Sequence, residues 1–82
     1  MAFSSLDQFR RGQSGEIVAI TAHQLRPKLS DMGLFPGKKI TMLFKAPLGD
    51  PIAVDVEGYT LSLRLDEAAL IQMKPLNPSE HA

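Results

Sequence analysis

Hydrophobic and polar residues alternate over several short stretches of the chain, which predicts a mainly β protein. Within residues 38–45 every second position is apolar (Ile40, Met42 and Phe44), so these side chains share one face of a predicted strand. Two stretches with the same alternation flank Gly58 and predict a β-hairpin with one buried and one wet face. Strands are predicted over residues 16–21, 38–45, 52–57, 59–64 and 70–73.

A helical period separates the first two strands. Leu25, Leu29 and Met32 recur at i, i+4 and i+7, the spacing of one apolar helix face, and predict a helix over residues 22–32. Pro27 is tolerated because the N–H groups of the first helical turn have no partner within the helix. Single helical turns are predicted behind capping residues, at residues 6–9 behind Ser4 or Ser5 and at residues 67–69 behind Asp66.

The predicted helix over residues 22–32 has a defined end at Gly33, because glycine readily adopts the left-handed conformation that terminates many helices. In that geometry Leu34 contacts Leu29 across the helix end. Pro36–Gly37 suits the two central positions of a type II turn, which leads into the next strand. A short helix, a stop and a tight turn therefore present Leu34 and Phe35 at a rigid corner.

A flat sheet of five short strands cannot enclose a core in a chain of 82 residues. Curling the sheet removes exposed edges and creates an interior, so the predicted fold is mainly β with short helices, a small SH3-like β-barrel. One domain is expected over residues 1–74, followed by a flexible C-terminal tail over residues 75–82. The predicted interior consists of Ile17, Ile20, Ile40, Met42, Val54, Val56, Leu61, Leu63 and Ile71.

Composition excludes several classes of function. Nine basic and nine acidic residues cancel, so the chain lacks the positive field expected of a nucleic-acid or membrane-surface protein. There is no cysteine, which excludes disulfides and thiolate chemistry. No apolar run approaches the roughly 20 residues of a membrane span, and the N-terminus lacks the features of a signal peptide. We therefore expect a cytoplasmic protein that neither binds nucleic acid nor inserts into a membrane.

The residues give no support for catalysis. His23 and His81 have no carboxylate or second histidine at helical ligand spacing, and the glycines form no phosphate-binding motif. Neither an enzyme activity nor a cofactor is expected. The side chains available to a hard metal ion, no two of which have a diagnostic spacing, are His23, Asp31, Asp50, Asp66 and Glu67.

A binding module is the class that remains. Apolar side chains on turns stiffened by glycine and proline lose little entropy when they dock, and two such turns occur, at residues 34–37 and 46–51. The apolar pair of the first turn has two interpretations, as core residues or as part of a docking surface, and Phe35 is the better candidate for the outside. The predicted partner-binding residues are Leu25, Leu29, Leu34, Phe35 and Leu48.

Three motifs occur in order along the chain: Leu29-x-x-Met32-Gly33-Leu34-x-Pro36-Gly37, then Ala46-Pro47-Leu48-Gly49-Asp50-Pro51, then Leu61-x-Leu63-Arg64 with the acidic helical turn behind it. In this order they resemble the ferrous iron transport protein A (FeoA) family. The resemblance implies a cytoplasmic bacterial SH3-like domain from a family not known for catalysis. It also implies action with a large membrane ferrous-iron transporter (FeoB-type) that bears a GTP-binding domain.

Two functional hypotheses follow. The first is an accessory protein that docks on the cytoplasmic GTP-binding part of the ferrous iron transporter and modulates uptake. The second is an Fe(II)-binding sensor or carrier that binds the metal directly through the carboxylates and histidine named above. Self-association through an unpaired edge of the barrel is a third hypothesis about partners.

Overall fold

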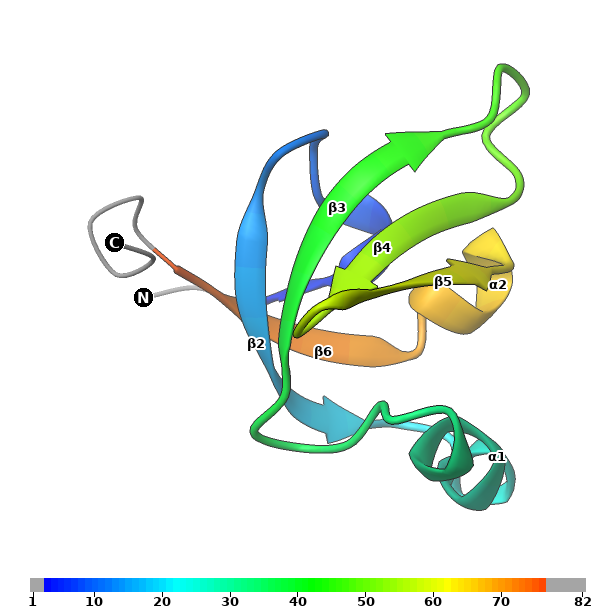
Figure 1. The fold of residues 1–82 in the computed structure, drawn as a ribbon. Coiled ribbons are helices and arrows are strands. Elements are labelled where there is room, and N and C mark those ends of the chain that lie inside the picture. The colour runs from blue at the N-terminus through cyan, green and yellow to red at the C-terminus, as the bar shows by residue number, and fades with distance from the viewer. Residues whose placement is uncertain (1–2, 77–82) are drawn as a thin grey trace.

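The strands form one antiparallel sheet in the order β1-β6-β2-β3-β4-β5 (Figure 1). The computed structural model describes residues 3–76. Its strands are β1 (Ser4–Ser5), β2 (Ser14–Ile20), β3 (Lys39–Lys45), β4 (Ile52–Val56), β5 (Tyr59–Leu63) and β6 (Ile71–Pro75). Its helical segments are the 3₁₀ turns η1 (Leu6–Gln8) and η2 (His23–Leu25) and the α-helices α1 (Arg26–Asp31) and α2 (Leu65–Ala68).

The outer strands β1 and β5 do not pair with each other within residues 3–76, so the curled sheet is a partly open barrel. Figure 1 shows α1 near the start of β3 and the loop between β3 and β4 at the opposite end of that strand. The mainly β architecture is confirmed, and the sheet of residues 3–76 has six strands where the alternation predicted five. The additional strand is β1, which is too short to show an alternating pattern.

The barrel encloses one hydrophobic core. Eight of the nine predicted interior residues are at most 4% exposed, and Leu61 is partly buried against them. Leu6 and Phe9, from η1 and the residue after it, join the same core and close one side of it. The core also contains Leu29, Leu34, Ile52, Ala68 and Met73.

The alternation predicted for β3 is wrong at Phe44. The register with β4 shifts between Met42, which lies opposite Val54, and Phe44, which lies opposite Ala53. Leu43 is the extra residue of this β-bulge, and it shifts the alternation by one position, so the next side chain points to the opposite face of the sheet. Phe44 is consequently 54% exposed rather than turned to the same interior as Met42.

The predicted helix over residues 22–32 is confirmed in position but begins as the 3₁₀ turn η2 and continues as α1, with Pro27 in the first turn of α1. The last helix begins earlier than predicted, at Leu65, and its N-cap residue is Arg64 rather than Asp66. Over the described part of the chain, no helix is long and apolar enough to cross a membrane.

Two residues of the expected C-terminal tail, Pro75 and Leu76, pair with the barrel. Strand β6 extends through Pro75, which lies opposite Gly15 of β2. The N–H of Leu76 then donates to the Ser14 carbonyl at 3.0 Å. These backbone pairings hold residues 74–76 on the barrel, and the rest of the predicted tail, residues 77–82, lies outside the described residues.

Candidate docking surface

The corner after α1 is built by the residues that end the helix. The N–H of Gly33 donates to the Ser30 carbonyl at 2.9 Å, and the N–H of Leu34 donates to the Leu29 carbonyl at 2.8 Å. These are the two hydrogen bonds of a Schellman ending. Gly33 has a φ of +90°, a conformation that a Cβ atom disfavours. The predicted helix end is therefore confirmed.

A tight turn follows the helix end. The N–H of Lys38 donates to the Phe35 carbonyl at 3.1 Å across Pro36 and Gly37, and Gly37 has a φ of +98°, as the predicted type II turn requires. Two further bonds tie the turn to β2, from Gly37 N–H to the Ile17 carbonyl at 2.8 Å and from Ile17 N–H to the Lys38 carbonyl at 2.9 Å. The backbone of this turn is anchored, whereas the ring of Phe35 remains 41% exposed.

A groove opens beside the corner, between β2 and α1. Its volume is about 440 Å³, within the range of sites that accept ligands. Most of its lining side chains are apolar, and the polar ones come from α1. The lining residues are Val18, Ala19 and Ile20 of β2, Arg26 and Ser30 of α1, and Leu34, Phe35 and Pro36 of the corner.

Arg26 is the one charged residue among those lining residues. Its Nε–H donates to the Ile20 carbonyl at 3.1 Å, which fixes the orientation of the guanidinium. Lys38 adds a second cation near the corner, with its Nζ 5.3 Å from the centroid of the Phe35 ring. The ion pairs within residues 3–76 leave Arg26 without a carboxylate partner: they are Lys28–Glu67, Lys38–Glu57 and Arg64–Asp66.

The predicted partner-binding residues lie in different environments. Leu29 and Leu34 are 0% exposed, so the prediction that they offer a docking surface is corrected: they sit in the core and hold the corner in place. Leu25 is partly buried against the core and lines a separate hollow beside Leu70. Phe35 is the predicted contact that is exposed beside the groove.

Leu48 lies at the other end of the barrel and is 97% exposed at the tip of the β3–β4 loop. Two backbone hydrogen bonds close this loop, from Gly49 N–H to the Ala46 carbonyl at 2.7 Å and from Ala46 N–H to the Pro51 carbonyl at 2.9 Å. The length of β3, about 20 Å for seven residues, separates it from the corner (Figure 1). Leu48 and Phe35 therefore belong to separate exposed sites.

Two of the eight groove residues, Leu34 and Phe35, are among the predicted partner-binding residues, and the other six are Val18, Ala19, Ile20, Arg26, Ser30 and Pro36. Two features of the sequence indicate residues of β2 and α1 in this groove. Val18-Ala19-Ile20 is an unbroken apolar run, which places apolar side chains on both faces of the end of β2. Arg26 and Ser30 are four positions apart and therefore share one face of α1.

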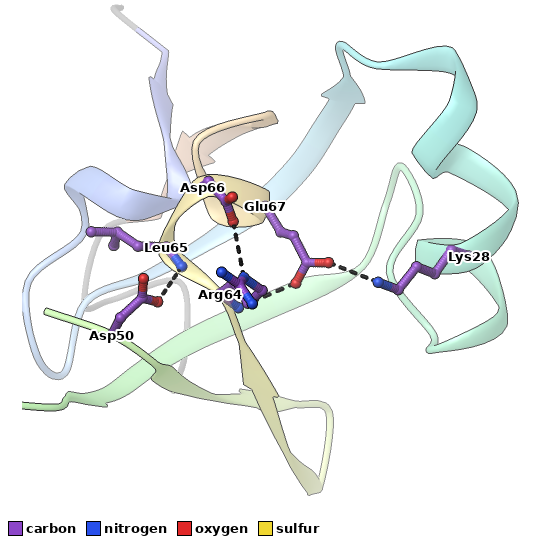
Figure 2. A network of polar contacts seen from close by, with 6 residues as sticks. All are labelled: Lys28, Asp50, Arg64, Leu65, Asp66 and Glu67. Atoms are coloured by element: carbon purple, nitrogen blue, oxygen red, sulfur yellow. Dashed lines mark hydrogen bonds and ion pairs between the residues drawn. The ribbon is translucent and has the colours of Figure 1, made fainter.

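The acidic residues around α2 form a network of capping contacts (Figure 2). Asp50 Oδ1 accepts the N–H of Leu65 at 2.6 Å, and Glu67 Oε1 accepts the N–H of Arg64 at 3.2 Å. Both contacts satisfy backbone donors at the beginning of the helix. Glu67 Oε2 accepts a hydrogen bond from Lys28 Nζ at 2.9 Å, which joins α2 to α1. This bond, with that from the Arg64 backbone, lowers the pKa of the Glu67 carboxyl group.

The candidate metal ligands do not converge on one point. Three of them, Asp50, Asp66 and Glu67, lie around the start of α2, whereas His23 belongs to η2 and Asp31 ends α1. Within residues 3–76, no group of three histidine or carboxylate side chains is arranged to hold a metal ion. Direct iron binding therefore stays a hypothesis.

Fold and site together define a class of protein: a small SH3-like β-barrel whose rigid corner presents an aromatic side chain beside an apolar groove. The FeoA domain model matches residues 4–75. The chain belongs to the FeoA family, which takes part in ferrous iron transport.

Known relatives agree with this assignment. A fusion of Fe(2+) transport protein A and Fe(2+) transporter FeoB from Porphyromonas gingivalis is 33% identical over 70 residues, which cover 84% of this chain and 8% of the fusion protein. The chain thus spans a small fraction of that relative. A FeoA-like protein from Clostridium acetobutylicum superposes with a TM-score of 0.86 at 35% identity, over 94% of this chain and 91% of that one.

A more distant structure supports the fold alone. FeoA of Stenotrophomonas maltophilia complexed with zinc, described as a prokaryotic SH3 domain protein, is 21% identical. It superposes with a TM-score of 0.72 over 85% of this chain and 88% of the other. The predicted SH3-like β-barrel is confirmed.

Proposed function

We propose that this chain is a cytoplasmic accessory protein of bacterial ferrous iron uptake, which docks on the cytoplasmic GTP-binding part of a FeoB-type transporter and modulates transport. The observation that carries this proposal is the anchored corner that holds Phe35 41% exposed beside an apolar groove. The choice of partner is supported by the Porphyromonas gingivalis relative, in which transport protein A and the transporter are one chain.

Phe35 has the properties of an interface anchor. Large aromatic side chains dominate the energetics of many protein–protein contacts. The backbone of the turn is already fixed by its hydrogen bonds to Lys38 and Ile17, so docking need not order it. Modulation of transport then requires only that the docked protein bind one conformational state of the transporter better than another.

A matched pair of substitutions tests the corner. Phe35→Asp and Leu48→Asp each place one new carboxylate on an exposed apolar site, at opposite ends of β3. We expect Phe35→Asp to weaken binding to the purified cytoplasmic GTP-binding domain of the transporter by roughly 30-fold, the equivalent of an interface anchor of about 2 kcal/mol. Leu48→Asp should leave the affinity nearly unchanged. Calorimetry measures both affinities, and thermal melting shows that both variants remain folded.

The opposite pattern of affinity losses would contradict the proposal. A large loss with Leu48→Asp and none with Phe35→Asp would place the contact on the β3–β4 loop and refute the corner. If the unmodified protein does not bind the transporter domain at all, the docking function itself is refuted.

Direct Fe(II) binding is the competing function, as in a sensor or carrier. Anaerobic calorimetric titration of the full chain with Fe(II) separates the two functions, because only the metal-binding function requires a saturable heat of binding in the absence of the transporter. Substitution of Glu67, whose two carboxylate oxygens already accept hydrogen bonds, would then identify whether the α2 carboxylates are the ligands.

A further inference from the structure

Arg26 gives the groove beside Phe35 a chemical preference. A guanidinium carries five N–H donors, and the Nε–H of Arg26 is used on the Ile20 carbonyl at 3.1 Å. The four donors on its Nη atoms take part in no side-chain hydrogen bond or ion pair within residues 3–76. Since one bond already orients the group, a planar acceptor can meet the free donors at little cost in side-chain entropy.

The surroundings of Arg26 favour a carboxylate as that acceptor. No acidic residue is among those described as lining the groove. The carboxylate of Glu57 is engaged elsewhere, by Lys38 Nζ at 3.6 Å and by the backbone N–H of Lys39 at 3.1 Å. Asp31, the acidic residue of α1, is exposed and is not a lining residue. The positive charge of Arg26 therefore faces an apolar groove that supplies no counter-charge.

The rest of the groove is suited to a hydrocarbon side chain. Val18, Ala19 and Pro36 form apolar walls around the arginine, so a ligand that fills the groove removes this surface from water. Bidentate arginine–carboxylate pairs are strong and directional, more so where water is partly excluded. A phosphate-rich ligand is a poorer match, because a single cation lines the groove.

We propose that this groove binds a segment of the partner protein in which an apolar residue is followed directly by an aspartate or glutamate. The apolar side chain packs against Val18 and Pro36, and the carboxylate pairs with the Nη donors of Arg26. The inference rests on the docking function proposed above and adds the chemistry of the partner segment.

Arg26→Gln and Lys28→Gln form a matched test, because both remove one positive charge from an exposed position of α1 and only Arg26 lines the groove. We expect Arg26→Gln to weaken binding to the cytoplasmic GTP-binding domain of the transporter by roughly tenfold, as for one lost charge-assisted contact. Lys28→Gln should change the affinity less than threefold on the same scale. Equal losses in the two variants, or no loss in either, would refute a specific contact at Arg26.

Synthetic peptides test the groove without the transporter and without substitutions. The ¹⁵N-labelled full chain is titrated with acetyl-Gly-Leu-Leu-Glu-Gly-amide, with the peptide in which Gln replaces Glu, and with octanoate. We expect amide shifts at Val18, Ala19 and Arg26 with the Glu peptide and at least tenfold weaker binding of the Gln peptide. Equal binding of the two peptides, or of octanoate as tightly as the Glu peptide, would refute recognition of an apolar–acidic protein segment.

The two measurements separate the two proposals. If the chain fails to bind the transporter domain but prefers the Glu peptide at the groove, the docking function fails and the ligand chemistry stands. If the transporter domain binds and Arg26→Gln matches Lys28→Gln, the docking function stands and the groove is not its specific contact.

Discussion

Gly33 lies where the corner after α1 meets Tyr59 of β5, and its replacement provides the sharpest test of how the corner is held. Gly33 has a φ of +90°. A Cβ atom built on it would collide with the hydroxyl oxygen of Tyr59, which donates a hydrogen bond to the Met32 carbonyl. Gly33→Ala therefore meets two obstacles, one from the backbone conformation and one from the tyrosine.

A second glycine allows the backbone cost of the substitution to be separated from the cost of displacing the tyrosine. Gly37 has a similar φ of +98°, but a Cβ atom there would meet nothing within 4 Å. Alanine in the left-handed conformation costs about 1–2 kcal/mol of stability. The lower entropy of the unfolded chain offsets part of this cost, to the same extent in both variants. Moving the tyrosine hydroxyl in Gly33→Ala sacrifices one more hydrogen bond, about 1 kcal/mol. Gly33→Ala should therefore melt about 4–8 °C below Gly37→Ala, given the size of the domain.

Chemical denaturation of the single and double variants measures this difference. In a Tyr59→Phe background the colliding hydroxyl is absent, so the cost of Gly33→Ala should fall to that of Gly37→Ala. The reasoning is refuted if Gly33→Ala and Gly37→Ala are equally destabilising in the unmodified protein. It is also refuted if Tyr59→Phe leaves the cost of Gly33→Ala unchanged.

Two further predictions concern the network around α2. Asp50→Ala should lower the free energy of unfolding, measured in urea, by about 1 kcal/mol, because the N–H of Leu65 loses its acceptor. Asp66→Ala should be nearly neutral, because the contact of Asp66 with Arg64 is long, at 3.7 Å, and exposed. Equal effects would contradict the capping role. The pKa of Glu67 is lowered in the folded protein, so its stabilisation is present above the ordinary value of 4.5 and is lost as the pH falls through the lowered folded pKa. Glu67→Gln should therefore lower the free energy of unfolding at pH 7 by up to about 1 kcal/mol, and this difference should shrink as the pH falls below 4.5; a constant difference would contradict this assignment.

Local backbone chemistry explains why the corner could be predicted from sequence. The Schellman ending and the type II turn each depend on hydrogen bonds between residues three to five positions apart, and on glycine at two positions with positive φ. Gly33, Pro36 and Gly37 determine these features whatever the rest of the chain does. The burial of Leu34 follows from the same local geometry, and this left Phe35 as the exposed member of the pair.

Features that depend on distant partners could not be predicted in this way. The sequence favours Asp66 as the cap of the last helix because aspartate is a common N-cap residue. In the structure, however, the N–H of Leu65 is satisfied by Asp50, fifteen residues earlier in the sequence and brought close by the β-hairpin. The alternation places Phe44 on the same strand face as Met42 because nothing in it marks a bulge, which is a property of the pairing between β3 and β4. In both cases the deciding contact is between strands or across a loop.

The groove itself arises from where β3 leaves β2. The pairing of these strands ends at Glu16 opposite Lys39, and β2 continues to Ile20 with β6 on its other side only. Pro36–Gly37 turns the chain away at this point, so within residues 3–76 the last apolar residues of β2 have no strand on that side, and α1 covers them only in part. The turn that anchors Phe35 therefore also opens the groove next to it. The groove is a consequence of strand pairing that stops early, and the exposed apolar surface it leaves is what the proposed partner segment would bury.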